Sequence, residues 1–143
     1  MVHLESRNLH LDRKEIESWH DAVLGIVADF RITVDDIDIY HEVEFPVLEL
    51  AYQMHRWLVC GIAHGEDLEY ESMESETSPL IWFRRDGDKW SIGAVHQMRP
   101  SGVVERRDLE SAAQEFITGL DDSVRTLFGL SLLSVLVDGV ARA

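Results

Sequence analysis

The clearest alternation of apolar and polar residues lies between residues 23 and 45. In VLGIVADFRITV the even positions from Leu24 to Val34 are apolar, and polar side chains fall among the odd ones. The next run, IDIYHEVEF, repeats the pattern with one face made of Ile37, Ile39, His41, Val43 and Phe45. A two-residue period is typical of half-buried strands. We therefore predict a β-hairpin that turns at Asp35-Asp36 and sets Val34 opposite Ile37 and Ile32 opposite Ile39.

A helical period follows this hairpin directly. Pro46 suits the first position of a helix, because no amide hydrogen is needed there. Apolar residues then recur at steps of three and four: Val47, Leu50, Ala51, Met54, Trp57 and Leu58. This spacing predicts an amphipathic helix from 46 to about 60 that stops near Gly61 and lies across the hairpin.

Strand patterns return in the second half of the chain. We predict strands at 67–73, 80–85 and 89–97, with a turn at Arg85-Asp86-Gly87-Asp88 between the last two. In the last strand Trp90, Ile92, Ala94 and His96 share one face. The three tryptophans Trp57, Trp82 and Trp90 are expected in the core where the helix crosses the sheet.

A second amphipathic helix is predicted from 109 to about 127. Asp108 is its expected N-cap, and Gly129 is placed to end it. The segment LSLLSVLV at 130–137 is apolar and of ambiguous type, and LDRKEIESWH near the N-terminus has the pattern of a short helix. Together these elements predict a single α+β domain over 1–143, with an antiparallel sheet of about five strands and two main helices packed on one face.

Composition narrows the class of protein. With 143 residues, 45% of them hydrophobic, the chain can bury a single-domain core. Its one cysteine, Cys60, excludes an internal disulfide and stands in an apolar stretch, which suggests a buried thiol in a reducing compartment. The N-terminus lacks the apolar core of a secretion signal, and 130–137 is too short to cross a bilayer. We expect a cytoplasmic protein.

Charge is distributed unevenly along the chain. The net charge is −14, and residues 32–83 hold 12 acidic side chains but only one basic side chain, Arg56. A nucleic-acid ligand or an anionic membrane would need Lys and Arg there, so we expect neither. The densest segment is EDLEYESMESE at 66–76, with six carboxylates. If 67–73 is a strand, its carboxylates lie in a row on one face. This face is either a charged edge that resists aggregation or a docking face for a basic protein.

No motif for catalysis or metal binding stands out. His55, Cys60 and His64 are the nearest thing to a zinc cluster, but Gly61 interrupts the helix between them and His55 would point elsewhere. No nucleophile elbow, phosphate loop, dinucleotide fingerprint or complete calcium loop occurs. We therefore expect no catalytic residue, no metal and no cofactor.

One set of residues resembles a known family. The series includes Phe45-Pro46-Val47, Glu49-Leu50-Ala51, Trp57, Tyr70, Ser72-Met73, Trp90, Ile92-Gly93, Val95 and Gln97. It resembles small bacterial domains of unknown function with the pattern F-P-V-x-E-L-A, a helix ending in Trp, a strand with S-M, and W-x-x-G-S-V-x-Q. The resemblance covers about residues 22–97 and departs at Ala94, where the pattern has Ser, and at the unusually acidic segment 66–76. By size, acidity and lack of a catalytic motif the chain also resembles, in type, immunity proteins that neutralise bacterial toxins.

Three functions remain open from the sequence. The first is a non-catalytic binding protein, most concretely an immunity protein that pairs with a basic nuclease-type toxin. Its binding residues would be Glu66, Asp67, Glu69, Glu71, Glu74, Glu76, Asp35, Asp36 and Asp38. The second is a small-molecule-binding or enzymatic domain with a pocket between helix and sheet, using His41, His55, His96, Tyr40 or Tyr70; RRDGDKWSIGAVHQ resembles the last hairpin of NTF2-like domains. The third is a self-associating protein that forms a homodimer through residues 130–137.

Overall fold

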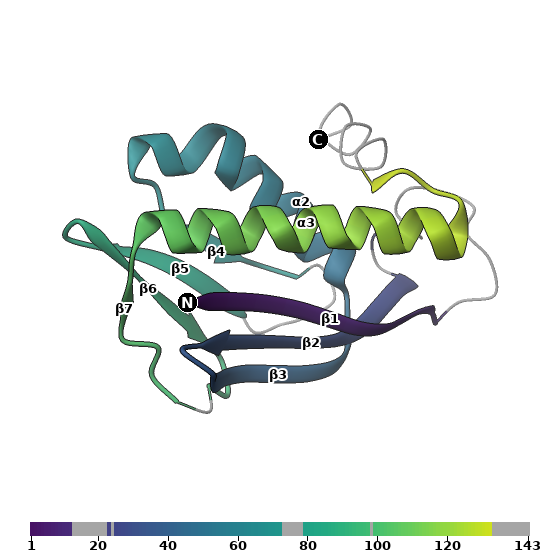
Figure 1. The fold of residues 1–143 in the computed structure, drawn as a ribbon, viewed down its shortest axis with the longest axis horizontal. Helices are drawn as coiled ribbons and strands as arrows, with labels where there is room; N and C mark the ends of the chain where they lie inside the picture. The colour runs from purple at the N-terminus through teal and green to yellow at the C-terminus, as the bar shows by residue number, and fades with distance from the viewer. Residues whose placement is uncertain (13–22, 24, 73–78, 98, 133–143) are drawn as a thin grey trace.

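The structure is a computed structural model that describes residues 1–12, 23, 25–72, 79–97 and 99–132 (Figure 1). Its elements, in chain order, are β1 (Val2–Leu11), β2 (Ile26–Val34), β3 (Ile37–Phe45), α2 (Val47–Arg56), the π-helix η1 (Trp57–Gly61), the 3₁₀-helix η2 (Ile62–His64), β4 (Leu68–Tyr70), β5 (Ile81–Asp86), β6 (Lys89–Ala94), β7 (Val103–Val104) and α3 (Arg106–Phe128). Most of the predicted N-terminal helix and residues 133–137 of the apolar segment lie outside the described residues, so the expected homodimer stays a prediction.

The strands form two antiparallel sheets, where one sheet of about five strands was predicted. The first sheet has the order β1-β2-β3 and the second has the order β4-β5-β6-β7. The α+β class is therefore right, while the single sheet is wrong. The sequence prediction missed β1 because its apolar alternation fades after Leu4, and it missed β7 because two residues show no period.

The predicted hairpin forms, but its register differs beyond the turn. Asp35 and Asp36 both have positive φ, at 52° and 66°, as a two-residue turn of the primed type requires. Val34 lies opposite Ile37 as predicted, whereas Ile32 lies opposite Tyr40 rather than Ile39. The irregularity gives β3 an extra residue, which is the effect of a β-bulge. The apolar face predicted for residues 37–45 is therefore wrong in part.

The bulge decides which side chains of β3 are inside. Ile39 and Tyr40 are neighbours in sequence, yet both are buried, at 1% and 3% exposure. Ile37 and Val43 are 45% and 53% exposed, and His41 is also on the surface. A second irregularity near Glu44, which has φ of 54°, returns Phe45 to the core.

The helices cover the sheets and close the core. In Figure 1, α3 runs in front of the sheets, and it contacts both β1 and α2. Phe30 of β2 joins the layers, since its ring centroid lies 5.0 Å from that of Phe45 and 5.5 Å from that of Phe116 on α3. The helix begins at Arg106 with Glu105 as N-cap, so the predicted cap at Asp108 is wrong; Gly129, at φ 67°, ends it as predicted. No helix in the described part of the chain has the length and apolar character to span a membrane.

Candidate functional site: an acidic groove beside an edge strand

An open groove of about 450 Å³ runs between the α2–η1 helical segment and strand β4. We call it the acidic groove. Its lining residues are Tyr52, Gln53, Arg56, Trp57, Cys60, Gly61, Glu66, Asp67, Leu68, Glu69 and Glu71. Six acidic residues between 66 and 76 were predicted to bind a partner. Four of them line this groove, whereas Glu74 and Glu76 lie outside the described residues.

Strand β4 directs its carboxylates outward for a simple reason. Leu68 and Tyr70 are buried, at 5% and 0% exposure, so the two-residue period turns Asp67, Glu69 and Glu71 to solvent. This part of the prediction is confirmed. Among the described residues β4 is the edge of its sheet and pairs with β5 alone, so no described strand covers its other edge.

Side chains of the helix hold the main chain of this acidic segment in place. The Gln53 amide donates to the Glu71 carbonyl at 2.7 Å and accepts from the Glu71 backbone N–H at 3.2 Å. The Trp57 indole N–H donates to the Glu66 carbonyl at 2.8 Å. Such bonds satisfy main-chain groups that an edge strand would otherwise leave open. They also fix the distance between the two walls of the groove.

The charge of the groove is only partly compensated. Asp67 accepts a hydrogen bond from the Arg85 backbone N–H at 2.8 Å, and Glu69 lies 3.4 Å from the Arg84 guanidinium. Glu66 and Glu71 form no ion pair within 4.0 Å to any described residue. The guanidinium of Arg56, the only cation in the lining, lies 5.9 Å from the centre of the Tyr52 ring. The groove therefore keeps a strong excess of negative charge.

A buried hydrogen bond joins the two walls beneath the groove. The Tyr70 hydroxyl donates to Glu49 Oε1 at 2.6 Å, and the two residues are 0% and 2% exposed. Burial raises the pKa of the Tyr70 phenol, and the nearby Glu49 raises it further. Sequence reasoning did not identify Glu49 as a partner. A helical period places Glu49 on the same side of the helix as Gln53 and Arg56, away from the apolar stripe, so no local pattern indicated its burial.

The second predicted acidic patch lies elsewhere. Asp35, Asp36 and Asp38 sit at the β2–β3 turn and do not line the acidic groove. Asp35 pairs with the amino terminus of Met1, and Asp38 lies 3.6 Å from the Arg31 guanidinium. Their role in binding a partner remains a prediction.

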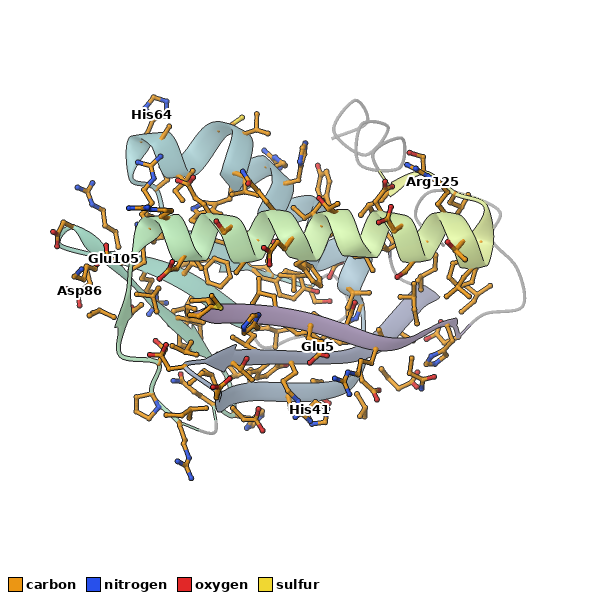
Figure 2. The ribbon with its side chains drawn as sticks, in the orientation of Figure 1. Glu5, His41, His64, Asp86, Glu105 and Arg125 are labelled. Atoms are coloured by element: carbon orange, nitrogen blue, oxygen red, sulfur yellow. The ribbon has the colours of Figure 1, made fainter. Side chains whose placement is uncertain are left out.

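The three histidines suggested for a small-molecule pocket lie on separate elements. His41 lines a shallow charged groove with Glu5, Arg7, Asp29 and Arg31, and Figure 2 shows His41 and Glu5 on the three-stranded sheet. His55 is half-buried on α2, and His96 is exposed at φ 54° in the turn after β6, not in line with Trp90. Tyr40 is buried, and burial raises its pKa to about 12.

Cys60 is exposed, so the predicted buried thiol is wrong. It belongs to η1, where the chain winds as a π-helix, and it lines the acidic groove. The tryptophan prediction holds for Trp57 and Trp90, which are buried at 5% and 3% exposure. Trp82 is only half-buried, and the Arg84 guanidinium lies 4.6 Å from the centre of its ring system.

Fold and site together define a small α+β domain with an acidic groove beside an edge strand. The chain belongs to the family described as a domain of unknown function, DUF7878, whose model matches residues 3–126. No curated protein and no solved structure matches the chain. Membership agrees with the resemblance to a family of unknown function, and the description of the family names no activity.

Proposed function

We propose that this domain is a non-catalytic binding protein for a basic protein partner, and that the acidic groove receives the partner's Lys and Arg side chains. The observation that carries the proposal is the convergence of Glu66, Asp67, Glu69 and Glu71 on one groove. An immunity protein that neutralises a nuclease-type toxin in the cytoplasm is the most concrete form. A nuclease uses basic side chains to bind phosphate, so a groove of carboxylates can occupy the same side chains.

Electrostatics decides how such a complex behaves. Exposed ion pairs contribute only about 0.2–1 kcal/mol each, so several must form together. A coherent negative field also accelerates encounter and excludes acidic partners. Because the Debye length falls to about 8 Å at physiological ionic strength, binding through the groove should weaken steeply as salt is added.

A matched pair of variants tests the groove against net charge alone. The groove variant is Glu66→Gln/Asp67→Asn/Glu69→Gln/Glu71→Gln. The control variant removes the same number of charges from exposed positions outside the groove: Glu42→Gln, Asp86→Asn, Glu115→Gln and Asp122→Asn. A fluorescent arginine-rich peptide serves as the probe in an anisotropy titration at low salt and at about 150 mM salt.

We expect the groove variant to lose about tenfold or more in affinity, which corresponds to about 1.4 kcal/mol. The control variant should lose much less, and the wild-type affinity should fall steeply with salt. An equal loss in both variants would show that only the overall charge matters. The same pair can then be tested against any toxin encoded beside this gene.

A further inference from the structure

A second pocket, of about 360 Å³, lies beside η2 and Gly65, which precede Glu66 in the chain. Its lining residues are Ile62, Ala63, His64, Gly65, Arg85, Asp88, Trp90 and Arg106. Three of them, His64, Arg85 and Arg106, are basic residue types, and they come from η2, β5 and α3. Figure 2 shows this end of the molecule, with His64 above Glu105 and Asp86. A basic pocket is unexpected in a chain whose net charge is −14.

The Arg85 side chain is held in place but not neutralised. Its Nε donates to the Gly87 carbonyl at 2.9 Å. Its guanidinium also lies against Gly65, where an added Cβ would come within 2.3 Å of Nη1 and where φ is 72°. No described carboxylate lies within 4.0 Å of this guanidinium. The terminal N–H groups of Arg85 are therefore positioned without an acidic partner.

Arg106 approaches the same pocket from the start of α3. It is the first residue of a 23-residue helix whose N-cap, Glu105, makes no side-chain capping bond. The Arg106 guanidinium forms an ion pair with Glu110 one turn later through Nε, which orients the guanidinium and partly compensates its charge. The positive end of the helix dipole adds to the potential of the two guanidinium groups.

We propose that this pocket binds the phosphate group of a small phosphate monoester. Guanidinium groups form planar, bidentate hydrogen bonds to phosphate oxygens, and two of them line the pocket from different elements. Ile62 and Trp90 supply an apolar wall, and the volume exceeds what a phosphate group alone would fill. Asp88 also lines the pocket and forms no ion pair with Arg85 or Arg106 among the described residues. Its carboxylate therefore repels a bound phosphate and weakens binding. The site is independent of the acidic groove and of the function proposed for it.

Two matched pairs of substitutions test the pocket. Arg106→Met removes a lining cation, whereas Arg107→Met removes the neighbouring exposed cation outside the lining. Asp88→Asn removes the lining carboxylate, whereas Asp86→Asn removes an exposed one two residues away. Each protein is titrated with glycerol phosphate, inorganic phosphate and acetate, and the Trp90 indole N–H signal is followed by NMR along with the backbone amides.

We expect saturable binding of glycerol phosphate with a dissociation constant on the order of 1 mM. Arg106→Met should weaken it about tenfold and Arg107→Met less than about twofold, while Asp88→Asn should strengthen it more than Asp86→Asn. Should Arg106→Met disturb the fold, Arg85→Lys keeps the charge, loses the planar fork and should also weaken binding. Equal effects within either pair, no saturation, or acetate binding as tightly as the phosphate monoester would overturn the proposal.

Discussion

The hydrogen bond between Tyr70 and Glu49 links α2 to β4, the two elements that form the walls of the acidic groove. Tyr70→Phe is the smallest change that removes it, because the ring stays and only the hydroxyl is lost. Tyr70 also packs against Phe45, with ring centroids 5.6 Å apart, and this contact should survive the substitution. The variant therefore removes the hydrogen bonds of the hydroxyl, to Glu49 and to Ser72, and leaves the packing of the ring.

The expected loss of stability in Tyr70→Phe follows from the burial and geometry of this hydrogen bond. The donor and acceptor oxygens are 2.6 Å apart, and both residues are at most 2% exposed. A hydrogen bond to a carboxyl group in such a setting contributes about 1.5–3 kcal/mol. For a domain of this size we expect the free energy of unfolding to fall by that amount and the Tm to fall by about 5–10 °C.

Urea unfolding followed by tryptophan fluorescence measures this loss. Tyr52→Phe is the control, because Tyr52 is half-buried on α2, the helix that carries Glu49, and its hydroxyl makes no hydrogen bond to a described residue. We expect this control to change the free energy of unfolding by less than about 0.5 kcal/mol. Glu49→Gln completes a double-mutant cycle, in which the two single losses should not add. If Tyr70→Phe were no more destabilising than Tyr52→Phe, the buried bond would not join the walls as argued.

Three further predictions concern the core and the second sheet. Because burial raises the pKa of Tyr40 to about 12, the contribution of Tyr40 to stability should be fully present below about pH 10 and should be lost as the pH rises from 10 towards 12. Tyr40→Phe should reduce the fall of the urea midpoint over that range, and an unchanged pH profile would contradict this. Gly93→Ala would place a Cβ 2.0 Å from Trp82 Nε1, so we expect the free energy of unfolding to fall by about 1–3 kcal/mol. The loss should be smaller when Trp82→Ala is also present, and fully additive losses would argue against the clash. Phe30→Ala should lower the free energy of unfolding by about 3–5 kcal/mol, measured by heat or urea, because Phe30 packs on Phe45 and Phe116. Val43 is exposed, so Val43→Ala should change it by less than about 0.5 kcal/mol. Similar losses in the two variants would refute this account of the core.

Local periodicity was sufficient for much of the fold. The two helical stripes, the turns at Asp35-Asp36 and Gly87, and the inward direction of Leu68 and Tyr70 were all readable, since each depends on residues close in sequence. The bulge in β3 was not readable. It shifts the phase of the alternation by one residue and exchanges Tyr40 for His41 in the interior. The bulge lies in an edge strand, where packing against β2 and the core decides which side chains are buried, and no short pattern encodes that.

The candidate site was predictable only as a list of residues. The outward ladder Asp67, Glu69 and Glu71 followed from the strand period, but the wall opposite it did not. That wall depends on the π-helical turn that exposes Cys60 and on Gln53 and Trp57 reaching the main chain of the acidic segment. Both are contacts between elements that the sequence places separately.

By itself, the sequence determined the α+β class, the amphipathic faces of the helices and the concentration of negative charge in residues 32–83, because these are properties of composition and of neighbouring residues. The tertiary structure alone decided that the strands divide into two sheets, that Glu49 meets Tyr70, and that Glu66 to Glu71 line one groove while Asp35 to Asp38 lie apart. The physical reason is that periodicity fixes the direction of a side chain relative to its own element. Only the packing of elements distant in sequence fixes what that side chain meets.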